Sequence, residues 1–379
     1  MNNLILSYSS HNLDSIIEKI KNNDPALFMF FYGADNNYKD FEKKLNALSI
    51  PYIGCMDSGR LVAGRYLLDN NSIVGMSISK KVINKIIIDS IDMSPDRTPE
   101  IIKNESREKF VKAAAKLGID LQNPDMERDI AIDILYGLNS ATPVLEGQSV
   151  AGLMLQTAGG SSGGKTDFKE SNVISSAGSG HVGAFALIRF NEKYKFVIDR
   201  ISSFDTVSIN ALEVTKLAGP RHILELNNKP ATEEYCSKIG IDISELKPDT
   251  FANYTLGLEP GDGERFITSI MMKDDAAGLI TYNDVIIGTK FNLYKSKKQE
   301  QDRINGLKKI ADKNIIGFIS FDCILCYLAR NTLDEVNVIA KVYEDVLPGI
   351  PKIGFGTFSE NICGVNVNQT ETYLAVYEG

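Results

Sequence analysis

The sequence predicts an α/β fold in two lobes, with mixed β-sheets and outer helices built from repeated strand–helix–strand–turn–strand units. Three observations lead to this prediction. Apolar runs of strand length alternate with amphipathic helical segments along much of the 379 residues. Hairpin signals in the middle of the chain indicate that the sheets are mixed and not purely parallel. The third observation is an internal repeat, because Ile50-Pro-Tyr-Ile-Gly54 returns as Ile350-Pro-Lys-Ile-Gly354.

The first copy of this repeat begins with an apolar run at 26–32, which predicts a strand. Apolar residues spaced three and four apart at 37–48 then predict an amphipathic helix. The Ile-Pro-Tyr-Ile-Gly segment forms the second strand and leads into a polar turn at 56–60. A strand at 72–79 closes the unit.

The last copy follows the same order. Its first strand is expected at 315–321 and its helix at 331–346. The second Ile-Pro-x-Ile-Gly segment comes next, with a polar turn at 356–361 and a closing strand at 372–377. Two copies at the two ends of the chain indicate that the repeat organises the fold.

A weaker middle copy places a strand at 131–138 before 142–147, which takes the position of Ile-Pro-x-Ile-Gly. Its closing strand is expected at 181–189. The glycine-rich segment 158–164 then takes the position of the polar turns in the other copies. We therefore interpret this segment as one of three equivalent turns.

Less regular segments lie between the copies. A helix is expected at 105–117, and the charged segment 296–313 is expected to be helical. Turn signals separate strands expected at 194–198, 222–226, 266–272 and 285–290. The chain is expected to divide into an N-terminal region, 1–210, and a C-terminal region, 211–379.

Residues 159–166 also satisfy the phosphate-loop pattern G-x-x-x-x-G-K-[ST]. In such a loop, Lys165 contacts the outer phosphates and Thr166 holds magnesium, after a buried strand that would here be 149–157. A helix must open directly on the Lys-Thr pair, but the residues that follow lack helical apolar spacing and break at Gly178. A nucleotide-binding enzyme acting through this loop remains the alternative to a glycine-rich turn.

Composition narrows the classes of partner. The chain is 43% hydrophobic and 24% charged, which is ordinary for a globular protein, and its net charge of −8 argues against nucleic acid or an anionic membrane as the main partner. No apolar run approaches the ~20 residues of a membrane span. The five cysteines are too few and scattered for a disulfide framework, so a reduced, cytoplasmic protein is the simplest interpretation.

Other reactive residue types give weaker signals. Cys323-Ile-Leu-Cys326 lacks the second pair of ligands that zinc needs, and its apolar middle favours a structural over a redox role. Three histidines are too few for a metal cluster, and His181 is the best candidate ligand if haem is bound. G-x-S-x-G occurs at 159–163 without the helix that a nucleophile elbow requires. These residues favour a binding domain over an enzyme, without cofactor or catalytic residues.

The ordered set of turn motifs resembles the FIST sensory domains, with an N-terminal FIST region followed by a C-terminal one. The matching segments are Gly54–Gly59 (similar to Gly-Cys-Ser-Thr-Ala-Gly), Gly159–Gly163 (Gly-Gly-Ala-Ala-Gly), Ile223–Tyr235 (the linking segment), Phe321–Cys323 (Phe-Ser-Cys), Gly354–Glu360 (Gly-Phe-x-x-x-Gly-Glu) and Asn368–Thr370 (Asn-x-Thr). The resemblance covers nearly the whole chain. The chain departs from the usual pattern at Arg60, Gly164, Cys326 and Ser359, so its recognition chemistry is expected to differ.

The resemblance implies a domain that binds small molecules, amino acids among them, and passes the signal to an output module. No kinase, chemotaxis, cyclase or F-box segment remains beside the matching regions, so a separate signalling protein is expected as partner. A small polar metabolite is expected where the polar turns converge, in a cleft between lobes, with charge supplied by Arg265 and Glu360. The expected ligand-binding residues are Cys55, Ser58, Gly59, Gly159, Gly160, Ser161, Ser162, Gly163, Arg265, Phe355, Thr357 and Glu360. Haem-based gas sensing is a further alternative.

Overall fold

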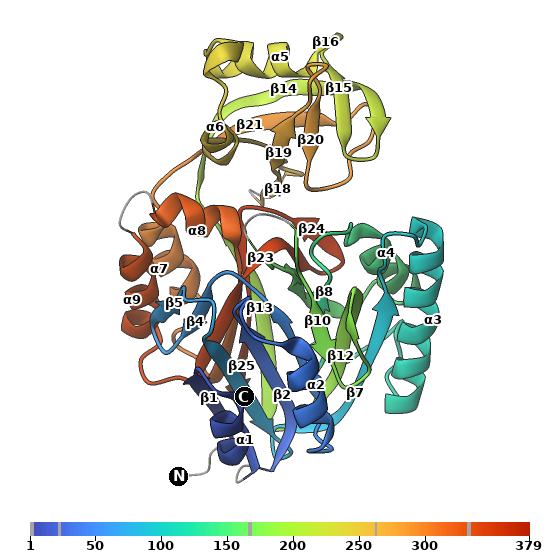
Figure 1. The fold of residues 1–379 in the computed structure, drawn as a ribbon, viewed down its shortest axis with the longest axis vertical. Coiled ribbons are helices and arrows are strands. Elements are labelled where there is room, and N and C mark those ends of the chain that lie inside the picture. The colour runs from blue at the N-terminus through green and yellow to red at the C-terminus, as the bar shows by residue number, and fades with distance from the viewer. Residues whose placement is uncertain (1–3, 22–23, 166–168, 262–263, 332–334) are drawn as a thin grey trace. The chain divides into compact units, whose positions relative to one another are not determined.

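The computed structural model describes residues 4–21, 24–165, 169–261, 264–331 and 335–379, and it confirms a mixed α/β fold (Figure 1). The chain forms two compact units. The first comprises Met1–Ile201, Arg303–Asn366 and Glu371–Gly379, and the second comprises Ser202–Asp302 and Val367–Thr370. Neither unit is one continuous segment, because the chain leaves the first unit after Ile201 and returns to it at Arg303.

The first copy of the repeat is present in the first unit. Strand β2 (Pro25–Tyr32) pairs in parallel with β3 (Tyr52–Met56) and antiparallel with the closing strand β6 (Ile73–Ser79). Helix α2 (Tyr38–Asn46) connects the parallel strands and begins at Asn37, whose side chain accepts a hydrogen bond from Lys39 N. The order predicted for this copy is confirmed.

The last copy has the same connectivity. Strand β22 (Asn314–Cys323) pairs in parallel with β23 (Lys352–Ile362) and antiparallel with β25 (Thr370–Glu378). Helices α8 (Ile324–Asn331) and α9 (Val336–Val346) lie between the two parallel strands in sequence. The polar turn expected at 356–361 is wrong, because these residues continue β23.

The middle copy repeats the pattern with β8 (Asp129–Leu135) parallel to β9 (Gln156–Ser162) and antiparallel to β12 (Val182–Phe190). Three details of the prediction are wrong. The segment 142–147, expected at the position of Ile-Pro-x-Ile-Gly, lies in helix α4 (Thr142–Ala151), and the strand expected at 149–157 overlaps the same helix. The segment expected as a turn at 158–164 forms most of β9. Glycine and serine therefore make a buried central strand here, because neighbouring strands pair with it on both sides.

One glycine occupies the same position in every copy. Gly54, Gly159 and Gly354 each lie on the second strand, opposite a residue of the first strand in the parallel ladder. A Cβ at these positions would lie 2.1, 2.0 and 2.8 Å from the carbonyl oxygen of that opposite residue. Only glycine fits such an approach, which explains why it recurs in the repeat.

The copies combine into two sheets. The six-stranded sheet has the order β1-β6-β2-β3-β10-β11, and the other sheet has the main path β13-β25-β22-β23-β9-β8-β12-β7. The strands not yet given are β1 (Ile5–Ser10), β4 (Arg60–Val62), β5 (Arg65–Leu67), β7 (Ile83–Asp92), β10 (Val173–Ser175), β11 (Gly178–Gly180), β13 (Tyr194–Ser202) and β24 (Val365–Val367). Strand β4 pairs with both β23 and β5, and β24 pairs with β23.

The main core of the first unit contains side chains of both sheets. Phe31 of β2 packs on Phe355 of β23 with ring centroids 4.4 Å apart. Helices α1 (Leu13–Lys21) and α2 cover one outer face with a second cluster of buried residues. Helices α3 (Pro99–Leu117) and α4 cover another outer face, and α7 (Glu300–Lys308) and α9 contribute to a further cluster on β22 and β25.

The second unit is a separate eight-stranded sheet with its own core. The strand expected at 222–226 is confirmed as β15, whereas the strand expected at 285–290 is wrong because regular pairing begins only at Lys290. The elements of this unit are β14 (Phe204–Gly219), β15 (His222–Leu226), β16 (Lys229–Pro230), α5 (Ala231–Ile239), the 3₁₀ helix η1 (Ile243–Glu245), α6 (Pro248–Asn253), β17 (Tyr254–Leu258), β18 (Phe266–Thr268), β19 (Ile270–Lys273), β20 (Leu279–Thr281) and β21 (Lys290–Ser296). Of the helices in the described residues, none has the length and apolar character needed to span a membrane.

Candidate functional site

The segments that follow β3 and β9 meet the middle of β23 inside the first unit. Gly356 N donates a hydrogen bond to Gly59 O at 2.8 Å, and Gly164 N donates to Met56 O at 3.3 Å. Ser58 Oγ donates to Gly164 O. These contacts join residues that lie about 100 to 300 positions apart in the chain. We call residues 56–60, residues 163–164 and Gly356 the strand-end cluster.

A buried aspartate–arginine pair lies at the centre of the strand-end cluster. Asp57 Oδ1 accepts hydrogen bonds from Gly59 N at 2.6 Å and from Arg60 Nη1 at 3.1 Å. Arg60 also donates to the Asp57 carbonyl at 3.0 Å, to Ser72 Oγ at 2.9 Å and to Asp69 O. Both charged side chains are completely buried. Asp57 Oδ2 has no hydrogen-bond partner in the described part of the chain.

The ionisation of this region reflects its burial. Burial raises the pKa of Asp57 to about 7, although Arg60 and the Gly59 N–H both oppose the shift. The neighbouring Cys55 is also fully buried, and burial raises the pKa of its thiol well above the usual range. Because the thiolate is the reactive form, Cys55 is a buried residue of the core and not an activated nucleophile.

Polar side chains surround the same cluster. Tyr32 OH donates to Asn172 Oδ1, and the hydroxyl groups of Ser162 and Ser171 contact each other. Ser58 is only partly buried, although Asp57 and Gly59 on either side of it are buried.

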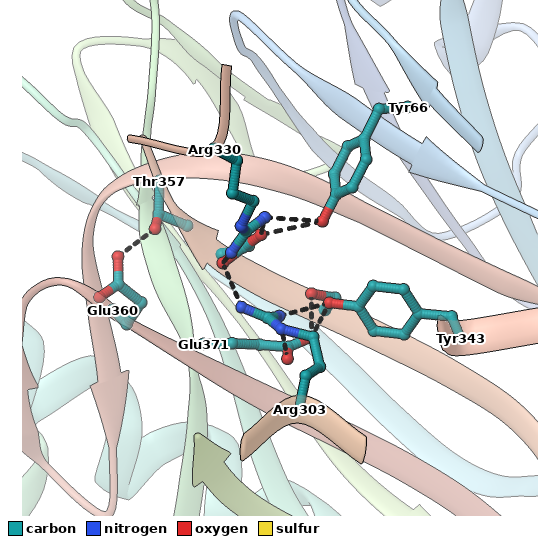
Figure 2. Close-up of polar contacts among 9 residues, drawn as sticks. Tyr66, Arg303, Arg330, Tyr343, Thr357, Glu360 and Glu371 are labelled. Atoms are coloured by element: carbon teal, nitrogen blue, oxygen red, sulfur yellow. Dashed lines mark hydrogen bonds and ion pairs between the residues drawn. The ribbon is translucent and has the colours of Figure 1, made fainter. Parts of the chain in front are cut away.

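A second buried polar group, which we call the charged cluster, lies beside the carboxyl end of β22 (Figure 2). Asp322 accepts hydrogen bonds from Arg330 Nη2 at 2.8 Å and Arg303 Nη2 at 3.3 Å on Oδ1. Its Oδ2 accepts from Arg330 Nη1 and from Tyr66 OH at 2.9 Å. Burial opposes ionisation, but the two guanidinium groups outweigh it and lower the pKa of Asp322 to about 2.

Glu371 completes the charged cluster. Its Oε1 accepts from Ser320 Oγ at 2.5 Å and Tyr343 OH at 2.6 Å, and its Oε2 accepts from Arg303. Burial raises the pKa of Glu371, and Arg303 opposes the rise. Every carboxylate oxygen of Asp322 and Glu371 thus has a donor, which is the arrangement expected of a structural buried network.

Most of the expected ligand-binding residues lie in the first unit, but several are used inside the sheet. Gly159 to Ser161 lie between β8 and β23, and Ser162 pairs with β23. Phe355 packs in the core against Phe31. Glu360 is fully buried and accepts a hydrogen bond from Thr357 Oγ1 (Figure 2). The expected placement of Glu360 on a loop is therefore wrong, since the residue lies within β23.

The remaining residues separate into two groups. Ser58, Gly59 and Gly163 belong to the strand-end cluster, where a Cβ on Gly163 would lie 2.0 Å from Gly356 O. Arg265 belongs to the second unit, where it contacts Glu259 at 3.5 Å and donates to Phe204 O. The contacts that the structure gives Arg265 all lie within that unit, and its role at the ligand site stays a prediction.

The phosphate-loop motif has the wrong surroundings for a nucleotide. Lys165 Nζ pairs with Glu170 Oε2 at 2.5 Å, and Lys165 N donates to Glu170 O at 2.8 Å, so the chain turns back on itself. Described residues 169–172 form no helix, and β10 begins at Val173. The backbone amides of Gly159 to Ser162 lie within the sheet, and Thr166 lies outside the described residues.

The cysteine and histidine residues considered for metal or haem binding have the following surroundings. Cys323 and Cys326 are both buried at the junction of β22 and α8, and neither is in a disulfide. His181 lies against Tyr136, with ring centroids 4.6 Å apart. Within the described ranges, no three histidine, cysteine, aspartate or glutamate side chains are grouped to hold a metal ion.

Sequence reasoning missed the charged residues that the fold buries. Asp57 and Arg60 flank a turn that is recognisable from the sequence, but their complete burial is not. Asp322, Arg330 and Glu371 come from three separate elements. A usable signal exists for Asp57 and Asp322, because each ends an apolar strand of the repeat, where polar side chains of different strands meet.

Two family models together cover most of the chain, the FIST N domain over residues 26–229 and the FIST C domain over residues 231–363. The chain belongs to the FIST family. FIST domains are associated with sensory signal transduction. No curated protein matches this FIST chain.

Among solved structures, the FIST chain is similar to phosphoribosylformylglycinamidine synthase II of Thermotoga maritima, with 9% identity, coverage of 98% of this chain and 72% of that chain, and a TM-score of 0.18. It is also similar to T. maritima PurL complexed with ATP, with 10% identity, coverage of 98% and 71%, and a TM-score of 0.19. At such TM-scores the likeness carries no argument about fold or function.

Proposed function

We propose that this FIST protein is a sensor that binds a small polar metabolite with an amino group at the strand-end cluster. One observation carries the proposal: Asp57 Oδ2 is a buried carboxylate oxygen without a hydrogen-bond donor in the described residues. Such atoms are rare in folded proteins and require an explanation. An ammonium group supplies up to three donors and an opposite charge, which makes it a suitable partner.

The surroundings of Asp57 support this class of ligand. Arg60 fixes Oδ1 of the carboxylate together with Gly59 N, which leaves Oδ2 in a defined direction. Backbone groups of the glycine-containing strand ends lie next to it and can approach a ligand closely, because they carry no side chain. Amino acids combine an ammonium group with a carboxylate, and they are therefore the first class to test.

The proposal places the receiver of the signal in a separate protein and the sensor in the cytoplasm. None of the five cysteines, all of which lie in the described residues, is in a disulfide, which suits a reducing compartment. A binding role is favoured over nucleotide hydrolysis because residues 159–162, the first half of the phosphate-loop motif, are engaged in the sheet.

A thermal-shift screen with the common amino acids, polyamines, nucleotides and haem tests the proposal. A ligand at 100 times its dissociation constant adds about 2.7 kcal/mol of stability, which such a screen detects. We expect an amine-bearing hit whose binding is lost in Asp57→Asn. Asp133→Asn is the matched control, because Asp133 is also a fully buried aspartate whose pKa burial raises to about 7.

Loss of binding in Asp57→Asn alone supports the site. Equal loss in both variants, or tight binding of a ligand without an amino group at the same site, contradicts it. Affinity should also rise with pH toward 7 in the unmodified protein, because Asp57 must ionise to bind an ammonium group. Asp57→Asn should remove that dependence.

A further inference from the structure

A hollow of about 690 Å³ opens in the first unit at the amino ends of β2 and β3. Its volume lies within the range of about 300–1,000 Å³ that is typical of small-molecule sites. Pro51 borders it at one end of β3, whereas Asp57 follows the other end, six residues further along an extended chain. At about 3.3 Å per residue the two sites are roughly 20 Å apart. The hollow therefore takes no part in the function proposed above.

The floor of the hollow is apolar. Leu48, Ile50, Ile83 and Ile86 line it, together with prolines and alanines from β2 and from the loop before β3. A narrow apolar gap lies behind this floor, enclosed by residues of α1, α2, β2 and β3, and it shares Leu48 and Ile50 with the hollow.

The rim of the hollow is charged. Lys80 Nζ pairs with Asp24 Oδ1 at 2.7 Å, but the two side chains are 65% and 77% exposed, so the pair is weak and easily shared with another anion. Lys21 also lines the hollow and has no acidic partner in the described part of the chain. The rim carries two lysines and one aspartate, and the aspartate is already paired with Lys80. The resulting positive charge favours an anion at the rim.

We propose that this hollow binds a small monocarboxylate with an unbranched aliphatic chain. The carboxylate lies at the rim beside Lys21 and Lys80, and the chain lies on the apolar floor. A purely polar metabolite leaves that floor exposed to water, and an amphipathic amine places a positive charge beside two lysines. A carboxylate with an apolar chain satisfies both parts of the lining.

The absence of tryptophan from the sequence gives a direct assay. Ala47 lines the hollow and is exposed, so Ala47→Trp introduces a single fluorescent reporter at the site. The probes are hexanoate, octanoate, decanoate, octanol and octylamine. We expect the dissociation constant to fall about fourfold for each added methylene, because a buried methylene contributes about 0.8 kcal/mol. Octanol and octylamine should bind at least about tenfold more weakly than octanoate.

Charge variants test the rim in the reporter background. Lys21→Glu combined with Lys80→Glu should weaken octanoate binding about tenfold or more. Lys19→Glu is the matched control, since Lys19 lies on the same helix but does not line the hollow. The proposal is overturned if octylamine binds as well as octanoate, if chain length has no effect, or if the control weakens binding as much as the double variant.

Two further variants test the floor of the hollow and its independence from Asp57. Ile86→Gln places an amide on the floor at a partly buried position and should weaken decanoate more than hexanoate. Circular dichroism and thermal unfolding verify that each variant is folded. Asp57→Asn should leave octanoate binding unchanged, so the two proposed sites succeed or fail independently.

Discussion

Asp57 and Asp322 are both buried aspartates that lie beside an arginine, in two copies of the same repeat. Their pKa values nevertheless shift in opposite directions. Asp322 receives donors on both oxygens from two arginines and a tyrosine, and its pKa falls to about 2. Asp57 receives donors on one oxygen, and its pKa rises to about 7. Burial is nearly the same, so the opposite shifts follow from the neighbouring charges and donors, which are two guanidinium groups and a tyrosine at Asp322 but one guanidinium group and one backbone N–H at Asp57.

The largest expected effect is on stability at Asp322. Asp322→Asn removes the negative charge shared by Arg303 and Arg330, which leaves buried positive charge without compensation. Breaking a buried pair in this way costs about 3–5 kcal/mol. Asp57→Asn should cost less, because Asp57 with a pKa of about 7 is only partly ionised at pH 7 and Asn Oδ1 still accepts from Gly59 N and from Arg60. Urea unfolding of both variants at pH 7 measures the difference.

Equal destabilisation by Asp322→Asn and Asp57→Asn would contradict the difference inferred between the two aspartates. Arg330→Met serves as a second measurement on the charged cluster, because it removes the partner and retains an apolar stem. It should also destabilise the protein strongly, since the Asp322 carboxylate then loses two donors.

The next effect concerns the glycines that make the copies equivalent. Gly54→Ala and Gly354→Ala each place a methyl group against backbone of the opposite strand, at 2.1 and 2.8 Å. We expect losses of about 1–3 kcal/mol from overpacking, larger at Gly54 because the approach is closer. Gly219→Ala is the control, because a Cβ there meets nothing within 4 Å. Thermal unfolding of the three variants ranks them, and a Gly219 variant as unstable as Gly54→Ala would contradict the steric explanation.

The repeat could be predicted from the sequence because it depends on local patterns of residues. The order of strands and helices in the first and last copies follows from apolar spacing and from a five-residue motif. In the middle copy, the turn predicted over β9 is wrong although glycine and serine are typical of turns. Pairing with β8 and β23 overrides that local preference, and β23 lies about 200 residues away in the chain.

The candidate site is only partly accessible from the sequence. Ser58 and Gly59 can be identified because they follow an apolar strand in a recognisable turn. The unpaired oxygen of Asp57 cannot, since it depends on the direction of Arg60 and on contacts with Ser72 and Asp69. Arg303, Arg330 and Glu371 come together around Asp322 only when α7, α8 and β25 pack on β22. No spacing of residues in the sequence predicts this arrangement.

A smaller effect concerns pH. Between pH 4 and 7 the folded protein holds a proton on Asp57 that the unfolded chain has released, so the free energy of unfolding falls as pH rises. Removing this group in Asp57→Asn should reduce that slope by up to about 1.4 kcal/mol per pH unit. Asp322 acts with the opposite sign, because its lowered pKa adds stability above pH 4 that is lost as pH falls toward 2.

Urea unfolding at pH 4.5, 5.5 and 6.5 measures this slope. Asp133→Asn should also reduce the slope of the free energy of unfolding against pH, because burial raises the pKa of Asp133 as well. A slope that is unchanged in Asp57→Asn would show that this carboxyl is ionised in the folded protein at pH 5.

The smallest effect is expected at the phosphate-loop lysine. Lys165→Ala removes an ion pair with Glu170 whose side chains are 41% and 50% exposed, and such pairs contribute about 0–1 kcal/mol. The stability should change by less than about 0.5 kcal/mol, and the binding of an amine ligand beside Asp57 should persist. Nucleotide-dependent stabilisation that disappears in Lys165→Ala would instead support a nucleotide site.

The interrupted path of the first unit has a consequence for how the protein is made. Strand β9 emerges from the ribosome long before its partner β23, so one edge of a glycine-rich strand waits unpaired while about 190 further residues are synthesised. At about 5–20 residues per second that delay lasts roughly 10–40 seconds. Exposed strand edges are templates for aggregation. The charged cluster closes later still, because it needs Glu371, which is synthesised after the whole of β23.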